Sequence, residues 1–260
     1  MTTLTDADLY TRGTATLIAS WEAYARAAAG AALERRAGVA VAVFPDEPER
    51  SVYNNAVLEA GLAPADRAEA IAAMEATYAH AGVTRFAAWV HETDQAARTD
   101  FEWRGYVLDT TTHAMGMALG AGFAAPDVDL APPDWVESLR VGGVPTSLLP
   151  GLDRDAFHVL IARLEGRNAS AAIAHDHEGD CGIYNVGTVE RARRRGLGTA
   201  LTALHLHDAL ERGCRTASLQ ATDMAESMYR TVGFRNLGRI LEYVPPAARV
   251  ATGTSPRPLR

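Results

Sequence analysis

The chain has 260 residues, of which 48% are hydrophobic and 22% are charged, and its formal net charge is -7 at pH 7. This composition supplies enough apolar surface for a sizeable core and excludes a disordered chain. The acidic balance disfavours broad binding to nucleic acid, because neutralising phosphates requires a basic face. All 25 basic residues are arginines, and the lack of lysine excludes Walker-type phosphate loops and Schiff-base chemistry.

The first half of the chain predicts, in order, a strand, an Ala-rich helix, a second strand, a short helix and a last strand. A Gly-aromatic turn, Arg104-Gly105-Tyr106, precedes that last strand. No apolar run approaches the roughly 20 residues that span a bilayer. We therefore expect a cytoplasmic protein that does not enter a membrane.

The middle of the chain, residues 124–134, is rich in Pro and Asp and has neither helical nor strand periodicity. This pattern predicts a linker. Together with the order of elements on either side, it predicts two domains, residues 1–126 and residues 127–260.

The second half begins with apolar runs at residues 157–162 and 169–174, separated by a Gly-containing turn. After a second turn, residues 181–188 complete an expected meander of three antiparallel strands. Two cysteines, Cys181 and Cys214, lack the spacing of metal ligands and are expected to be buried free thiols.

A glycine-rich turn follows the meander, with Gly196 and Gly198 at the start of a helix that ends before Gly213. The first N–H groups of a helix are unpaired and carry partial positive charge, so they can receive a pyrophosphate where no side chain obstructs it. A plain tight turn explains two such glycines equally well when they are taken alone.

An internal repeat links the two halves. Tyr53-Asn54-Asn55 recurs as Tyr184-Asn185-Val186 131 residues later, and Gly82 precedes Gly213 by the same distance. The Gly-aromatic turn of the first half matches Val232-Gly233-Phe234 after a slip of three residues. A duplicated domain predicts this similarity; chance likeness between Ala-rich segments is the alternative.

The second half resembles the GNAT (general control non-repressible 5-related) N-acetyltransferase superfamily, from Phe157 to Val244. The GNAT signature is Arg or Gln, two residues, Gly, any residue, then Gly or Ala, and it matches Arg193, Gly196 and Gly198 directly after a strand. A second family block matches Thr222, Ala225, Tyr229 and the turn Gly233-Phe234. Thr222 stands where the family commonly has Asn, which puts one contact to the pantetheine arm in doubt.

This resemblance implies a mixed α/β (α+β) fold with two tandem GNAT-like domains, each a mostly antiparallel, twisted sheet flanked by helices. It implies acetyl-CoA as acyl donor, no metal, and Tyr229 as the acid that protonates the departing thiolate. The residues that it assigns to coenzyme A are Val186, Gly187, Thr188, Arg193, Arg194, Arg195, Gly196, Leu197, Gly198, Thr199 and Thr222.

The first half lacks the matching residues. At the place of the phosphate turn it has Leu62-Ala63-Pro64-Ala65-Asp66-Arg67, which contains no glycine and carries an acid. Phe101 stands where the second half has Tyr229. We therefore expect this half not to bind coenzyme A but to serve as a structural partner that covers one wall of the active cleft; the sequence leaves open whether it shapes the acceptor pocket. The candidate lining residues are Trp21, Tyr24, Tyr53, Asn54, His91 and Trp103, and a place in a core or turn explains each of them equally simply.

The leading hypothesis is transfer of an acetyl group to a primary amine of a small molecule, with a homodimer as a possible assembly. The alternatives are a non-catalytic acyl-CoA sensor and an acyltransferase that acts on a protein or on aminoacyl-tRNA. The sequence does not identify the general base; the candidates are His175, Asp176, His177, Glu178 and Glu190.

Overall fold

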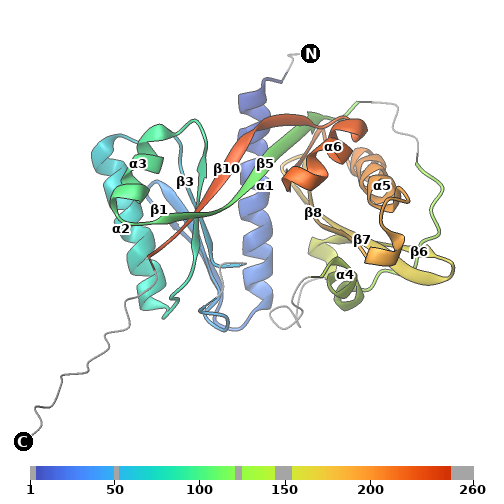
Figure 1. Cartoon of the computed structure of the whole chain (residues 1–260), viewed down its shortest axis with the longest axis horizontal. Helices are drawn as coiled ribbons and strands as arrows, with labels where there is room; N and C mark the ends of the chain where they lie inside the picture. Colours follow the sequence, from blue (N-terminus) through green and yellow to red (C-terminus); the bar gives the residue numbers. More distant parts are fainter. Residues whose placement is uncertain (1–3, 50–52, 121–124, 144–153, 247–260) are drawn as a thin grey trace, which may run out of the picture.

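The computed structural model describes residues 4–49, 53–120, 125–143 and 154–246, and places them around one ten-stranded sheet (Figure 1). The helices are α1 (Asp6–Ala27), α2 (Pro64–His80), α3 (Gln95–Trp103), α4 (Trp135–Gly142), α5 (Leu197–Glu211) and α6 (Asp223–Val232). The strands are β1 (Ala32–Arg36), β2 (Val39–Val43), β3 (Asn55–Leu58), β4 (Ala87–His91), β5 (Val107–Ala118), β6 (His158–Leu164), β7 (Arg167–His177), β8 (Asp180–Thr188), β9 (Thr216–Ala221) and β10 (Arg235–Val244).

The sheet order is β1-β2-β3-β4-β10-β5-β9-β8-β7-β6. Strands β1–β4 form an N-terminal wing and strands β6–β9 form a C-terminal wing, with β10 and β5 between them. The parallel pairs are β3 with β4 and β8 with β9, whereas the other pairs are antiparallel. The mixed, mostly antiparallel sheet expected from the sequence is therefore confirmed.

The last strand of each half crosses to the other wing. β10, from the end of the chain, pairs with β4 of the N-terminal wing, while β5 pairs with β9 of the C-terminal wing. The two crossing strands also pair with each other, as Figure 1 shows at the centre of the molecule. The two halves thus share one continuous sheet, which the sequence did not predict.

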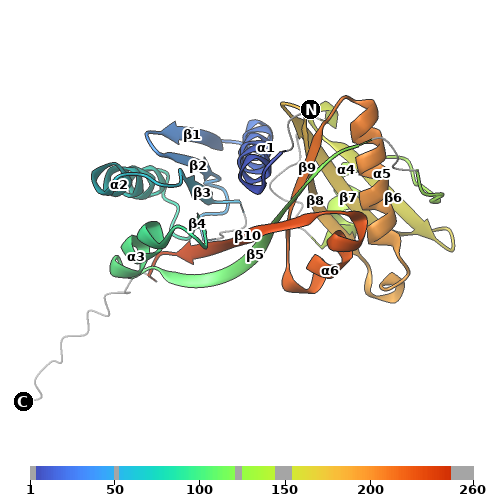
Figure 2. The same ribbon diagram turned by 90° about the horizontal axis from the view of Figure 1, so that it is seen from above.

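Helix α1 joins the two wings. Thr5 and Asp8 form a reciprocal capping box that fixes its start. Figure 2 shows the helix end-on between the wings, and it packs against strands of both. Gly13 permits this approach, because a Cβ atom there would lie 2.7 Å from Cβ of Ser218 on β9. Its buried side chains, among them Trp21 and Tyr24, face the space between the wings.

Each wing has a separate core beneath its own helices. In the N-terminal wing, α2 and α3 cover the sheet with buried Met74, Tyr78 and Phe101. In the C-terminal wing, α5 and α6 cover it, and both Cys181 and Cys214 are buried and free, as predicted. The predicted linker lies partly outside the described residues, since 121–124 are not among them; its remaining residues run along β6, with a bridge to Ala162.

Candidate functional site

The two parallel strands of the C-terminal wing separate part-way along their length. β8 and β9 pair from Asp180 to Gly182, and β8 then continues to Thr188 without pairing to β9. A bulge in β8 accompanies the separation, with Asn185 in the left-handed region at φ 52°. The facing edge of β8 therefore presents main-chain groups that no strand uses.

A cavity of about 270 Å³ fills the gap between the separated strands. We call it the wedge cavity; its lining residues are Ile183, Tyr184, Asn185, Val186, Gln220, Ala221, Thr222, Ala225 and Tyr229.

Helix α5 begins beside this open edge. Gly196 is its N-cap, with φ 77°, and no side chain caps the helix. A Cβ at Gly196 would have no other protein atom within 4 Å, so packing does not require the glycine there. The first turn contains no acidic residue, which leaves its amides and the positive end of the helix dipole available to an anion.

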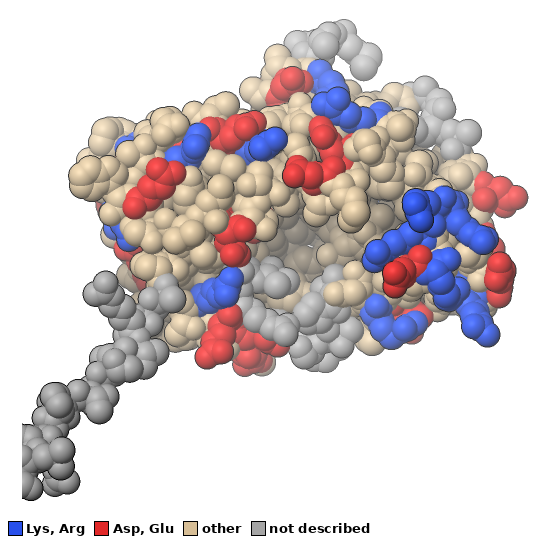
Figure 3. Space-filling model, viewed as in Figure 1, with Lys and Arg blue, Asp and Glu red and all other residues tan. Residues whose placement is uncertain are grey.

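The arginines of the turn surround this helix start. Arg193, Arg194 and Arg195 are exposed, and Nε of Arg193 donates a hydrogen bond to the carbonyl of Thr188 at 3.2 Å. Figure 3 shows arginine side chains gathered over the C-terminal half of the molecule. The turn thus combines free amides with positive charge, the combination that phosphate groups require.

Tyr229 lies on the wall of the wedge cavity, on α6. Its side chain is 6% exposed, and burial raises the pKa of its hydroxyl to about 12. The hydroxyl is therefore protonated at neutral pH and can act as a proton donor. Thr222, the N-cap of the same helix, makes no side-chain cap hydrogen bond, so its hydroxyl is not used to start the helix.

The structure gathers the residues that the resemblance assigns to coenzyme A. Val186, Thr222 and Tyr229 line the wedge cavity. The remaining residues lie on the end of β8, in the arginine turn or in the first turn of α5. Gly187 has a packing role as well, because a Cβ there would lie 2.5 Å from Cα of Gly142 in α4.

The candidate bases lie elsewhere. Residues 175–178 are at the hairpin between β7 and β8, at the opposite end of β8 from Thr188. Burial opposes ionisation of Asp176, but hydrogen bonds from His158 and Arg212 outweigh it and lower the pKa of Asp176. Burial lowers the pKa of His175, whose Nδ1 lies 2.7 Å from the carbonyl of Ala156. Neither these residues nor Glu190 line the wedge cavity.

One contact to α6 escaped the sequence analysis. His113 on β5 is 6% exposed, and its Nε2 donates to Oδ1 of Asp223 at 2.6 Å. Asn236 on β10 donates to Nδ1 of His113 at 2.9 Å and to Oε1 of Glu226 at 2.7 Å. The crossing strands β5 and β10 thereby hold α6, the helix that carries Tyr229, in position. No local sequence pattern predicts a contact between residues so far apart in the chain.

A second cavity, of about 330 Å³, lies between the two wings, where Figure 3 shows the surface to be hollowed. We call it the aromatic chamber, after Trp21, Tyr24, Tyr53, Trp89 and Tyr184 in its lining. Three of its lining residues, Tyr184, Asn185 and Gln220, also line the wedge cavity.

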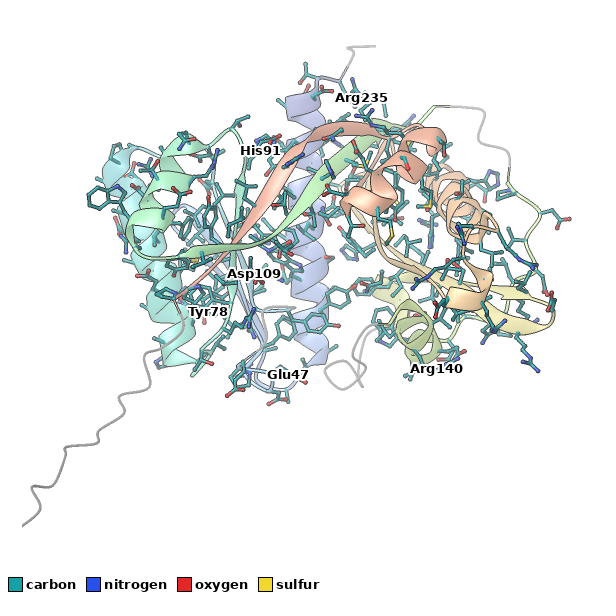
Figure 4. All side chains as sticks on the ribbon, viewed as in Figure 1. Glu47, Tyr78, His91, Asp109, Arg140 and Arg235 are labelled. Carbon is teal, nitrogen blue, oxygen red and sulfur yellow. The ribbon has the colours of Figure 1, made fainter. Side chains whose placement is uncertain are left out.

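The predicted lining residues divide into two groups. Trp21, Tyr24 and Tyr53 do line the aromatic chamber. Asn54 instead accepts a hydrogen bond from the main-chain N–H of Phe44, and Trp103 is 87% exposed. His91, labelled in Figure 4, has its Nε2 3.0 Å from the carbonyl of Leu237 on β10 and is absent from the described chamber lining.

Among the described residues, three side chains of α5 come close enough together to share a cation: His207, Asp208 and Glu211. They occupy the last turns of the helix, about 15 Å from its first residue by the helical rise. The wedge cavity lies at the other end of α5, so these side chains are not part of it.

Comparisons with known proteins agree with this geometry. The model of the acetyltransferase (GNAT) domain family matches residues 136–226. A GCN5-related N-acetyltransferase from Kribbella flavida has a similar structure, with a TM-score of 0.69, 18% identity and coverage of 92% of this chain and 97% of that one. A GCN5-related N-acetyltransferase from Sphaerobacter thermophilus gives a TM-score of 0.58, 16% identity and coverage of 87% and 92%.

No curated protein sequence is a significant match. In the part of the chain that the structure describes, no helix has the length and apolarity to span a membrane. The matched domain covers both strands of the wedge cavity and the glycine-rich turn, and a match to this domain family supports acyl transfer as the type of activity. Residues 136–226 are thus identified as a GNAT acetyltransferase domain, and the chain as a whole shares the fold of GCN5-related N-acetyltransferases.

Proposed function

We propose that the protein is a cytoplasmic N-acetyltransferase that moves an acetyl group from acetyl-CoA to the primary amine of a small molecule. In this proposal residues 127–260 form the catalytic domain, and residues 1–126 form a related domain that does not bind coenzyme A. The observation that supports this proposal most strongly is the open edge of β8, which lies beside the uncapped start of α5.

The residues of the C-terminal wing fit acetyl-CoA in three places. Main-chain groups from Val186 to Thr188 lie on the unpaired edge and can pair with the pantetheine arm as an added strand would. The amides from Arg194 to Thr199 can receive the pyrophosphate, with charge-assisted bonds from the arginines. The hydroxyl of Thr222 can make the contact to pantetheine that an Asn side chain commonly makes in the family.

The donor supplies the acetyl group as a thioester. A main-chain N–H near Thr188 is suited to polarise the thioester carbonyl, and it needs no special side chain. As the amine nitrogen bonds to the acetyl carbon and the carbon–sulfur bond breaks, Tyr229 donates its proton to the departing thiolate. The amine releases its own proton to water, and the Tyr229 phenolate takes up a proton from water, which restores the hydroxyl. No covalent enzyme intermediate is required.

Two measurements on the full chain test this proposal. Calorimetric titration should detect binding of acetyl-CoA, and release of free thiol from acetyl-CoA should depend on an added primary amine. If acetyl-CoA does not bind, the proposal is wrong. Tight binding without thiol release for a broad panel of amines would instead favour the acyl-CoA sensor.

A further inference from the structure

The aromatic chamber is placed to hold the acceptor. It shares Tyr184, Asn185 and Gln220 with the wedge cavity, so a molecule in the chamber meets the donor across these three side chains. Its volume of about 330 Å³ is in the range of small-molecule sites. The acceptor of the proposed reaction must approach the thioester from outside the wedge, and the chamber provides that approach.

The chamber walls are aromatic and rigidly held. Trp21 on α1 and Trp89 on β4 meet edge to face, with ring centroids 5.4 Å apart. Nε1 of Trp89 donates to Oδ1 of Asn55 at 3.2 Å, which fixes the orientation of its ring. Tyr24 and Tyr53 also meet edge to face, with ring centroids 6.2 Å apart. Such walls bury a flat or apolar body well.

The described lining contains no charged side chain. The chain has 25 arginines, and several of them lie in the turn before α5, but none lies in the described lining of the chamber. A carboxylate or phosphate in the chamber would lose its hydration without gaining a cation, which costs several kcal/mol. An uncharged lining also favours the neutral form of a bound amine, and the neutral form is the nucleophile.

Tyr24 lines the chamber with its ring. Its hydroxyl is buried and makes no hydrogen bond to any described residue, and burial raises its pKa. Because this oxygen has almost no exposed surface, a molecule in the chamber meets the ring of Tyr24 and not its hydroxyl. The amide side chains of Asn185 and Gln220 add donors and acceptors at the border with the wedge cavity.

From this lining we infer that the acceptor is a small primary amine with an aromatic or apolar body and no acidic group, held in the aromatic chamber. This inference rests on the proposed function. Amino acids, which carry a carboxylate beside the amine, find no cation in the described lining and should be poor acceptors.

The test compares amines that differ in one group. With acetyl-CoA as donor, kcat/KM for 2-phenylethylamine should exceed that for phenylalanine, which adds only a carboxylate, by about 100-fold. If phenylalanine matches 2-phenylethylamine while calorimetry still detects acetyl-CoA binding, the inference is wrong and the proposed function stands. If acetyl-CoA does not bind, the proposed function itself fails.

Matched variants locate the site. Trp21→Phe should raise KM for 2-phenylethylamine about tenfold and leave acetyl-CoA binding unchanged, whereas Trp103→Phe, at an exposed position on α3, should change neither. Trp89→Phe shortens the wall that faces Trp21, and KM should rise about fivefold. Unchanged KM values in both chamber variants would show that the acceptor does not bind in this cavity.

Discussion

The two wings of the sheet follow the same order of elements but end their parallel strands differently. In the C-terminal wing, β8 continues from Ile183 to Thr188 after its last pair with β9. In the N-terminal wing, β3 ends at Leu58, directly after Val57 pairs with Trp89. Among the described residues, only the first arrangement leaves several residues of a strand unpaired to its parallel partner.

The helices that follow these strands also differ at their first turns, in the N–H groups and charges that they present. Helix α5 starts with Gly196 and has no acid in its first turn. Helix α2 starts with Pro64, which has no N–H, and carries Asp66 in its first turn. A proline removes one donor and an acid occupies the positive end of the dipole. Both wings share the same order of elements, but only α5 begins without a proline or an acid in its first turn.

The third difference concerns a single hydroxyl. The main-chain N–H of Tyr106 donates to the carbonyl of Phe101 at 3.0 Å, and that of Phe234 donates to the carbonyl of Tyr229 at 3.1 Å. The two aromatic side chains thus occupy the same position relative to their turns. Phe101 is fully buried in a core, whereas Tyr229 reaches a cavity.

The largest effect that we predict comes from an acid at the start of α5. Gly198→Asp should weaken acetyl-CoA binding by about 100-fold or more, because its carboxylate competes with the pyrophosphate for the helix amides. Neighbouring side-chain atoms lie at 3.5 Å or beyond from a Cβ at this position. An acid in the first turn stabilises a helix, so the melting temperature should not fall.

Ala65→Asp is the matched control, at the second position of α2, on an exposed residue. It should leave acetyl-CoA binding unchanged in the same calorimetric titration. A comparable loss of binding in this variant would mean that the N-terminal wing takes part in binding the cofactor.

The second prediction exchanges the hydroxyl between the wings. Tyr229→Phe should lower kcat by about 100-fold, the usual scale of a lost general acid, while the Kd for acetyl-CoA stays within about threefold. Steady-state rates and calorimetry on the same preparation measure the two quantities. Equal rates for both proteins would remove Tyr229 from the mechanism.

The reverse exchange should have no catalytic effect. Phe101→Tyr adds a hydroxyl to a core side chain that is 0% exposed, so we expect the free energy of unfolding to fall by about 1–3 kcal/mol and kcat to remain the same. A gain of acetyl-CoA binding to the N-terminal wing would contradict the comparison.

The third prediction concerns the crossing strands. His113→Ala removes the hydrogen bonds that join β5 to Asp223 on α6 and to Asn236 on β10, and should lower kcat about tenfold through displacement of Tyr229, with little change in KM for acetyl-CoA. In the other wing, Tyr243 on β10 donates to Oε1 of Glu102 on α3 at 2.9 Å. Tyr243→Phe should reduce stability by about 1 kcal/mol and leave kcat unaltered. Equal kcat losses in both variants would indicate a global effect.

The fourth prediction is a pH dependence of stability. Burial, with a contribution from Asp109, raises the pKa of Glu242 to about 7 from an ordinary value of 4.5; Figure 4 labels Asp109 on β5. The folded state holds this proton more tightly, so stability is full below about pH 4.5 and decreases as the pH rises through about 7. Glu242→Gln should remove this loss, about 1–3 kcal/mol at pH 8.

Denaturant titrations between pH 4 and pH 9 measure this dependence. Asp109→Asn should move the transition to lower pH, because it removes a negative charge near Glu242. If Glu242→Gln instead changes the pH profile of kcat/KM, the N-terminal half takes part in the chemistry and the division between the wings must be redrawn.

Local patterns predicted the C-terminal wing well. Three apolar runs with Gly-containing turns predicted β6, β7 and β8, and Gly196, Gly198 and Gly213 bounded α5. These features depend on residues that are neighbours in the chain, so a single sequence contains them.

Features that depend on distant residues were not predictable. Strands β5 and β10 each fit as the last strand of their own half, and only tertiary pairing reveals that they cross. The aromatic chamber draws on α1, β4 and β8 as well as loop residues. Trp89, which completes its wall, has the pattern of an ordinary strand residue and gave no signal.

A crystal structure of the full chain with acetyl-CoA tests the central claim most directly. We predict one coenzyme per chain, with its pantetheine arm along the edge of β8 from Val186 to Thr188 and its pyrophosphate at the first turn of α5. A coenzyme seated against β3 and the start of α2 would contradict the account.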